Sequence, residues 1–458
     1  MSLLTGGARD LPTHQQTLRD AIGWSYDLLS TVEQHLFRRL AVFVGGCIPP
    51  AAEEVAGPEL GLDVFEGLAS LVDKSLLRFD EANDEPRFRM LETIREFALE
   101  QLESCGEDAT TRDRHATWCM RVAEETNVGS RQFPSVQRTV SAAREHDNLR
   151  AGLTYLEQSG QGERFLRMVV ELTGFWWVKS FKAEGFGWVE RALASAAGAP
   201  DHLRGYAMAR AAFVAHHLDK SDLGDSYIEQ AIPLLRSGGG AREKAHGALA
   251  VGAIATGRGE YHEALAPLEY AQREFRELGD LDWSAFLSHF LGINALGLED
   301  KLTARKHLEA ALEHELRGES TWSRGLTLEY QGFLAALEGE IGQAASKLQE
   351  SVAIWLEYGS TDRISDWLMR IVTLQPYLDR NAELARFVGA AEAIRDSLGT
   401  IWDLPERTYY ERAIQSLREA LGEVAYKSAR DIGRQLTPSQ VCGEGLELLR
   451  GLDARPSA

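Results

Sequence analysis

The sequence predicts a mainly α-helical protein: an N-terminal winged helix with a small β-hairpin, followed by an α-α superhelix of tetratricopeptide-like repeats. Three observations predict this fold. Amphipathic helical segments and two short strand-like segments follow one another over roughly the first hundred residues. Small residues then return every 40 residues from about position 201 onward. The composition, with 44% hydrophobic and 26% charged residues, is that of a globular chain and not of a disordered one.

The N-terminal helices follow from the spacing of apolar residues. One amphipathic helix is predicted over 17–29, where apolar residues recur at i, i+4, i+8 and i+11. Ser30 and Glu33 have the form of a capping box, so they begin a second helix, which ends at Gly45-Gly46. A third helix is predicted over roughly 62–74. The apolar residues of the first helix are Leu18, Ile22, Tyr26 and Leu29.

A β-hairpin and a closing helix are predicted next. Leu76–Phe79 and Arg87–Met90 indicate two strands, and Glu81–Asp84 indicates the turn between them. The segment LETIREFALEQL predicts a last helix that ends by about residue 104. Three helices, a hairpin and a closing helix describe a winged-helix domain over 17–105.

Four strings in this region resemble the winged-helix segment of bacterial STAND regulators, which are large ATP-dependent signalling proteins that include LuxR-type and AfsR-like regulators. They are GWSYDLL, LFRRLAVFVGG, GLASLVDKSLL and RFRMLETIREFALEQL, within about Asp10–Leu102. The resemblance implies that an NB-ARC-type ATPase domain precedes the winged helix, that residues 1–16 are a linker remnant, and that a helical-repeat sensor follows. The chain therefore resembles the C-terminal half of such a regulator, without its ATPase domain.

Two nucleotide-binding features of that family do not match this sequence. No GxxxxGK[ST] string is present, and this string is what cradles phosphates in a P-loop. Where relatives place a Met-His-Asp motif, this sequence has Met90-Leu91-Glu92. ATP hydrolysis is therefore not carried over from the resemblance, and we expect no bound cofactor.

The 40-residue period predicts five helix pairs over 201–400. Small side chains at fixed points let paired helices approach closely, and stacked pairs bury a continuous core. A helical connector is predicted over 106–200, and capping helices with a tail over 401–458. Pro233 and Pro267 fall inside helical patterns and should kink or shift those helices. The aligned small residues include Gly252, Gly292, Gly332, Ala255, Ala295, Ala335, Ala264, Ala304 and Ala344.

Candidate site residues follow from these two regions. A repeat superhelix presents a concave groove lined by the first helix of each pair. The groove candidates are Arg210, His217, His246, Trp283, His289, Asn294, Trp322 and Glu329. Each is also compatible with an ordinary packing or helix-surface role. Arg38, Arg39, Arg87 and Arg89 are candidates for interdomain ion pairs, with solvated surface charge as the alternative.

Charge and motifs argue against several functions. The 49 Lys and Arg residues stand against 69 Asp and Glu residues, and a net charge of −20 disfavours binding to phosphates. The third helix carries three acidic residues, Asp63, Glu66 and Asp73, and one basic residue, Lys74. Its net negative charge is unfavourable for contacts with DNA. No catalytic string is found, and the only metal-like group is His115 with Cys119, downstream of Cys105. The four cysteines and the lack of a membrane span fit a cytoplasmic protein.

The sequence thus predicts a non-catalytic signalling module of a STAND-type transcriptional regulator. Its repeat groove is expected to bind a protein, a peptide or a small inducer, and its winged helix to relay that state. A separate ATPase chain is one candidate partner. The alternative is a DNA-binding transcription factor that uses the winged helix directly. An enzyme on a repeat scaffold is the least favoured hypothesis, and no oligomeric state follows from the sequence.

Overall fold

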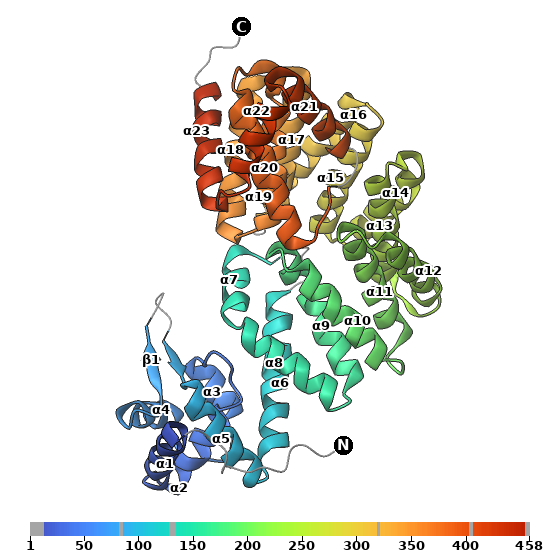
Figure 1. Ribbon diagram of the computed structural model, residues 1–458. Coiled ribbons are helices and arrows are strands. Elements are labelled where there is room, and N and C mark those ends of the chain that lie inside the picture. Colours follow the sequence, from blue (N-terminus) through green and yellow to red (C-terminus); the bar gives the residue numbers. More distant parts are fainter. Residues whose placement is uncertain (1–12, 82–85, 128–133, 318–320, 403–405, 454–458) are drawn as a thin grey trace. The chain divides into compact units, whose positions relative to one another are not determined.

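The computed structural model describes residues 13–81, 86–127, 134–317, 321–402 and 406–453 (Figure 1). Contacts divide the chain into two compact units. Unit 1 comprises Met1–Ala123 and Ala143–Gln161, and unit 2 comprises Glu124–Ala142 and Gly162–Ala458. The predicted linker over 1–16, the hairpin turn and the C-terminal tail lie largely outside the described residues.

Unit 1 contains the winged helix. The predicted capping box is confirmed, because Ser30 Oγ accepts from the Glu33 amide and Glu33 Oε2 accepts from the Ser30 amide at 2.8 Å. The hairpin pairs Phe79 with Phe88 in an antiparallel register. Two further helices complete the unit. In chain order its elements are α1 (Thr13–Asp27), α2 (Thr31–Leu40), α3 (Pro49–Val55), α4 (Val64–Asp73), β1 (Arg78–Asp80), β2 (Arg87–Arg89), α5 (Glu92–Ser104), α6 (Asp108–Thr126), the end of α7 (Val136–Arg144), and α8 (His146–Gln158).

One helix of the winged helix was not predicted. The segment Pro49–Val55 forms α3, with prolines at its first two positions. Proline is tolerated there because the first backbone N–H groups of a helix have no intrahelical partner. Ala51, Ala52 and Val55 of this short helix are fully buried. The predicted third helix is therefore the fourth, α4.

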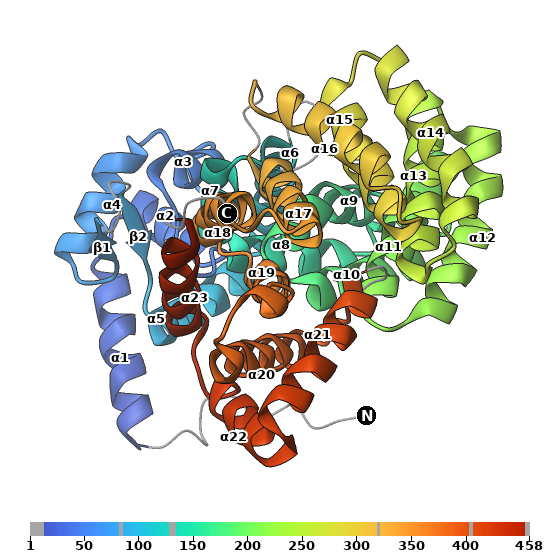
Figure 2. The ribbon, with the colours of Figure 1, turned by 90° about the horizontal axis from the view of Figure 1, so that it is seen from above.

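Unit 2 is a superhelix of antiparallel helix pairs that wind around a common centre (Figure 2). The predicted five pairs over 201–400 are confirmed: α11 (Asp201–His217) with α12 (Ser221–Gly238), α13 (Ala241–Arg258) with α14 (Tyr261–Glu277), α15 (Leu281–Gly297) with α16 (Lys301–Glu315), α17 (Trp322–Glu338) with α18 (Ile341–Tyr358), and α19 (Thr361–Val372) with α20 (Asn381–Leu398). One more pair, α9 (Gly162–Val178) with α10 (Lys182–Ser195), packs directly against the first of these. The superhelix thus begins inside the range assigned to the connector.

The repeating glycines lie where paired helices touch. A Cβ atom at Gly292 would stand 3.0 Å from Leu308 Cγ, and one at Gly252 would stand 2.6 Å from Leu268 Cγ. Gly332 faces Leu348 in the same way. This close approach is the physical reason for the 40-residue period. Pro233 and Pro267 do not end their helices, since α12 and α14 both continue past them.

The C-terminal helices cover the end of the superhelix. After the short 3₁₀ turn η3 (Gln375–Tyr377) and helix α20 come α21 (Glu406–Leu421), α22 (Glu423–Gly433) and α23 (Pro438–Asp453). Helix α22 packs against α20, and α23 packs against α18. Within the described ranges, none of the helices is both long and apolar enough to cross a membrane.

Candidate ligand-binding site

Two turns between helices of unit 2, far apart in the sequence, are joined by hydrogen bonds. In the turn from α9 to α10, Ser180 Oγ and Lys182 Nζ both donate to the Asp362 carboxylate, at the start of α19. Ser360 Oγ donates to the Val178 carbonyl, and Lys179 Nζ donates to the Tyr358 carbonyl at 3.0 Å. These contacts join the first helix pair of the superhelix to the turn between α18 and α19. The superhelix is thereby closed around its centre.

A pocket occupies this centre. The space between its walls is about 790 Å³ when the open solvent at its mouth is counted. Its lining comes from α9, α10, α11, α13, α15, α17, α19 and α20, and from Ile401, Trp402 and Glu406. Aromatic rings form much of the wall: Trp177, Phe213, Phe286, Phe290, Trp322, Tyr330 and Trp402. Charged side chains form another part: Lys182, Asp362, Arg363, Asp366, Arg395 and Glu406. Apolar walls with a few convergent polar groups are typical of small-ligand sites.

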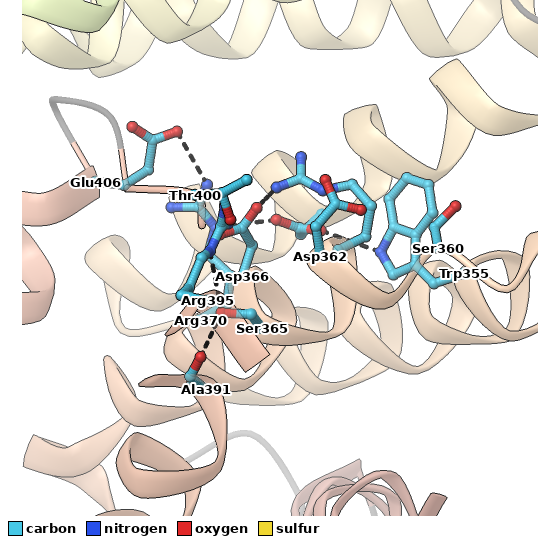
Figure 3. Close-up of polar contacts among 12 residues, drawn as sticks. Trp355, Ser360, Asp362, Ser365, Asp366, Arg370, Ala391, Arg395, Thr400 and Glu406 are labelled. Carbon is cyan, nitrogen blue, oxygen red and sulfur yellow. Dashed lines mark hydrogen bonds and ion pairs between the residues drawn. The ribbon is translucent and has the colours of Figure 1, made fainter. Parts of the chain in front are cut away.

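Asp366 is shared by two arginines, Arg363 and Arg395, and Figure 3 shows Arg395 beside it. Arg395 donates to Asp366 and also to Ser365 Oγ and Thr400 Oγ1, each at 3.2 Å. Arg363 forms a second ion pair with the same carboxylate. Asp362 meanwhile pairs with Lys182. Although burial opposes ionisation, Lys182 and both arginines hold the pKa of Asp362 well below its usual range, so this carboxyl is ionised.

A second buried cluster lies next to the first. Arg370 Nε is 3.4 Å from Glu329 Oε1, and Arg370 Nη2 is 3.3 Å from Glu406 Oε1. One guanidinium therefore serves two carboxyl groups. Burial, with a further contribution from the charge of Glu329, raises the pKa of Glu406 to about 8. Glu406 is therefore largely protonated at neutral pH.

Several buried polar atoms of the pocket wall form no hydrogen bond to any residue that the structure describes. His289 is 2% exposed, and its Nδ1 has no such partner. Burial and the charges of Arg363 and Arg370 lower the pKa of His289 to about 3, so its ring is neutral. Glu406 Oε2 and the indole Nε1 atoms of Trp177 and Trp402 likewise form no hydrogen bond to a described residue. The hydrogen-bonding capacity of these atoms is therefore unused among the described residues.

The predicted groove residues fall into three groups. His217, His289 and Trp322 line the central pocket. Arg210, His246 and Trp283 line a neighbouring pocket of about 500 Å³, which also contacts Trp177 and Phe213. Asn294 and Glu329 line neither pocket.

Both of these exceptions are held inside the helix packing. The Asn294 amide donates to the Tyr261 carbonyl at 2.8 Å and accepts from Thr256 Oγ1 at 3.2 Å. Glu329 is fully buried and accepts from Trp355 Nε1 at 3.1 Å. These two side chains thus stabilise the superhelix and do not face the pocket.

The charged part of the pocket wall was not predicted from the sequence. Lys182, Asp362 and Arg395 come from segments far apart in the chain, and only folding brings them together. A signal was nevertheless present in α19, where Asp362, Asp366 and Arg370 recur every four residues and all three are buried. Charged residues on a buried helix face need partners.

The arginines predicted for interdomain ion pairs are placed within unit 1. Arg38 and Arg39 bind Glu107, at 2.5 and 2.7 Å. Arg87 binds Glu145 at 2.6 Å and also donates to the Gly45 and Gly46 carbonyls, at 3.0 and 2.9 Å. Arg89 is half-exposed, 3.8 Å from Asp80. Arg38, Arg39 and Arg87 therefore join the winged helix to the helical segment that follows it.

The metal-like group of unit 1 is a buried packing contact. Cys119 Sγ donates to the Asn148 carbonyl at 3.2 Å, and His115 Nε2 lies 3.3 Å from Asn148 Oδ1. Burial lowers the pKa of His115 to about 4 and raises that of Cys119. Cys105 is exposed. Among the described residues, no three His, Cys, Asp or Glu side chains are grouped to hold a metal ion.

Comparison with known proteins supports the winged helix. A family model described as a winged helix-turn-helix domain matches residues 29–103. The Mycobacterium tuberculosis protein named "Putative HTH-type transcriptional regulator Rv0890c" is 39% identical over 194 residues, which is 42% of this chain and 22% of that protein. A Mycobacterium bovis protein with a corresponding name matches equally well. The matched part thus spans about a fifth of the length of these relatives.

Two further similarities cover other shares of the chain. "Uncharacterized protein Rv0894" of Mycobacterium tuberculosis is 34% identical over 131 residues, 28% of this chain and 33% of that protein. A solved STAND protein with a tetratricopeptide repeat sensor, from Pyrococcus horikoshii, has a TM-score of 0.45 and 12% identity, and the alignment covers 97% of this chain and 68% of that one. This chain therefore contains a winged helix-turn-helix domain and shares sequence with mycobacterial proteins named as transcriptional regulators.

Proposed function

We propose that the chain is the non-catalytic sensing module of a STAND-type transcriptional regulator, with a small inducer bound in the central pocket of unit 2. The observation that carries the proposal is one chain that combines a winged helix with a closed superhelix around an aromatic and charged pocket. The match to mycobacterial proteins named as transcriptional regulators supports the regulatory role. The pocket size favours a small inducer over a folded protein partner.

The closure contacts suggest how an inducer would act. Lys182 from one side of the closure and Asp362 from the other both line the pocket. An inducer that touches both sides stabilises the closed superhelix over an opened one, and only such a difference in affinity shifts an equilibrium between two states. The winged helix would relay the state of the superhelix to a partner.

We further propose that the partner is a P-loop ATPase domain, in the same polypeptide or in a separate chain. The matched region corresponds to only 22% of the length of the mycobacterial relatives, so those proteins contain much additional sequence. A P-loop ATPase would supply the second, nucleotide-dependent state that this chain does not encode in a recognisable motif.

Genome-wide transcript measurement tests the regulatory role. A strain that lacks this coding sequence is complemented with the wild type, with Trp402→Ala in the pocket, or with Arg305→Gln as a control outside it. We expect deletion and Trp402→Ala to change the same set of transcripts, and Arg305→Gln to restore the wild-type pattern. Unchanged transcripts in the deletion strain would contradict the proposal.

The alternative, direct DNA reading by the winged helix, is less well supported. The exposed residues of α4 include Phe65, Glu66 and Asp73, and Lys74 at its end is paired with Glu33 at 2.5 Å. This face offers little to attract phosphates. A mobility-shift assay with genomic fragments in about 50 mM salt, where electrostatic binding is strongest, separates the two functions. Specific retardation would favour direct reading.

A further inference from the structure

We propose that the central pocket binds a small organic anion with an aromatic body, an aromatic carboxylate, and that Arg363 contacts its charged group. The inference rests on the proposed function and specifies the chemical class of the inducer. Three features carry it: the distribution of ion pairs on the pocket wall, the aromatic rings around them, and buried polar atoms of the lining residues that have no hydrogen-bond partner among the described residues.

The ion pairs leave a positive charge at Arg363. Lys182 and Asp362 neutralise each other. Asp366 receives both Arg363 and Arg395, and Arg395 also donates to Ser365, Thr400 and the Ile401 carbonyl. Arg363 has no carboxylate of its own, and its Nε has no hydrogen-bond partner within the described chain. A ligand carboxylate would complete the pairing of this guanidinium.

The carboxyl groups of the wall do not offer a matching site for a cation. Asp362 and Asp366 are each paired with basic side chains. Glu406 shares Arg370 with Glu329, and its raised pKa of about 8 keeps it mostly neutral near pH 7.

The remaining wall suits a flat, unsaturated ligand. Trp177 stacks on Phe213 with ring centroids 4.8 Å apart, and Phe286 meets Phe290 edge to face at 5.0 Å. Such rings prefer stacked or edge contacts with another ring. The planar guanidinium of Arg363 matches the two oxygens of a carboxylate. His289 and Trp402 belong to the same wall, and their Nδ1 and Nε1 atoms have no hydrogen-bond partner among the described residues.

Isothermal titration of the full chain at pH 7 tests the ligand class. The probes are benzoate, phenylacetate and indole-3-carboxylate, each beside its neutral amide, together with benzylamine. We expect at least one carboxylate to bind and its amide to bind at least about 10-fold more weakly. Arg363→Gln should weaken carboxylate binding about 10- to 100-fold, because a charge-assisted hydrogen bond is lost.

Two matched variants make the result specific. Arg305→Gln removes an arginine that pairs with Glu338 away from the pocket, so it should leave carboxylate binding unchanged. Glu406→Gln removes the carboxyl of the pocket wall that a cation would use, so it shows whether any binding of benzylamine depends on that carboxyl. Far-UV circular dichroism and melting temperature establish that each variant is folded; Asp366 keeps Arg395 as a partner in Arg363→Gln.

Four outcomes would overturn the ligand class. They are amides that bind as well as carboxylates, full binding by folded Arg363→Gln, preferential binding of benzylamine that Glu406→Gln abolishes, and no carboxylate binding up to about 10 mM. None of these affects the transcript measurement. A failure of the ligand class is thereby distinguishable from a failure of the proposed regulatory function.

Discussion

Lys182 and Asp362 form an ion pair that is almost completely buried, although 180 residues separate them in the sequence. Their side chains are 3% and 6% exposed, and the Lys182 ammonium lies 4.4 Å from the centre of the Trp177 ring. Two charges taken out of water are stable together and costly apart. The pair therefore holds two ends of the superhelix in one relative position at the edge of the pocket.

Asp362→Ala should destabilise unit 2 by about 3–5 kcal/mol, because it leaves the Lys182 ammonium buried without a carboxylate. Urea unfolding followed by tryptophan fluorescence reports on this unit, since eight of the ten tryptophans belong to it. The double variant Lys182→Met with Asp362→Leu, which replaces both charges with apolar groups, should recover most of the loss. If the single variant is no less stable than the double variant, the ion pair does not have this role.

Arg87→Ala should destabilise unit 1, whereas Arg89→Ala should change its stability by less than about 1 kcal/mol. The two arginines flank Phe88 on one strand, but only Arg87 is buried, where it binds Glu145 and two backbone carbonyls. Its removal leaves a buried carboxylate unpaired, at a cost of about 3–5 kcal/mol. Hydrogen exchange of the hairpin and of α8 measures the difference, and equal exchange in the two variants would refute it.

Glu107 should make unit 1 sensitive to acid. Burial disfavours its charge, but the hydrogen bonds from Arg38 and Arg39 outweigh that effect and lower its pKa from 4.5 to about 2. A carboxyl with a lower pKa in the folded state stabilises the fold above pH 4.5, and this stabilisation is lost as the pH falls toward 2.

The variant Glu107→Gln tests this pH dependence. At pH 7 it should cost roughly 2–3 kcal/mol, since one pKa unit corresponds to about 1.4 kcal/mol. The gap between wild type and variant should narrow as the pH is lowered from 5 to 3, as measured by urea unfolding at each pH. A gap that stays constant over this range would show that the arginines do not act through the charge of Glu107.

The fold was largely predictable because its causes are local and periodic. The capping box at Ser30 and Glu33, the hairpin, and the returning glycines and alanines each involve residues close in sequence or at a fixed period. Helix α3 was not predicted, because its seven residues begin with two prolines and are too few to show a helical spacing of apolar residues. The pair α9–α10 was assigned to the connector and not to the repeats, because its close contact is made by Gly185 against Trp176, which differs from the repeating pattern.

The site was only partly predictable, for a different reason. Groove residues such as His289 and Trp322 could be proposed from their position in the first helix of each pair. The pairing of Lys182 with Asp362 depends on the closure of the superhelix, whereas Asp366 is shared by Arg363 of its own helix and Arg395 of the next. Periodicity predicts which helices stack, but it does not predict pairings between the two ends of a superhelix.

Gly389→Ala should destabilise the C-terminal part of unit 2 more than any substitution of a repeat glycine. A Cβ atom at Gly389 would collide with the Arg430 carbonyl of α22, and Gly433 stands in the reciprocal position against the Arg386 carbonyl of α20. Unlike the leucine tips that face Gly292, a helical carbonyl cannot rotate away, so the helices must separate. Overpacking of this kind costs about 1–3 kcal/mol.

Gly443→Ala is the matched control, because a Cβ atom there meets nothing within 4 Å. This substitution should stabilise α23 by up to about 1 kcal/mol. A melting temperature of Gly389→Ala at or above that of Gly443→Ala would refute the close packing of α20 on α22.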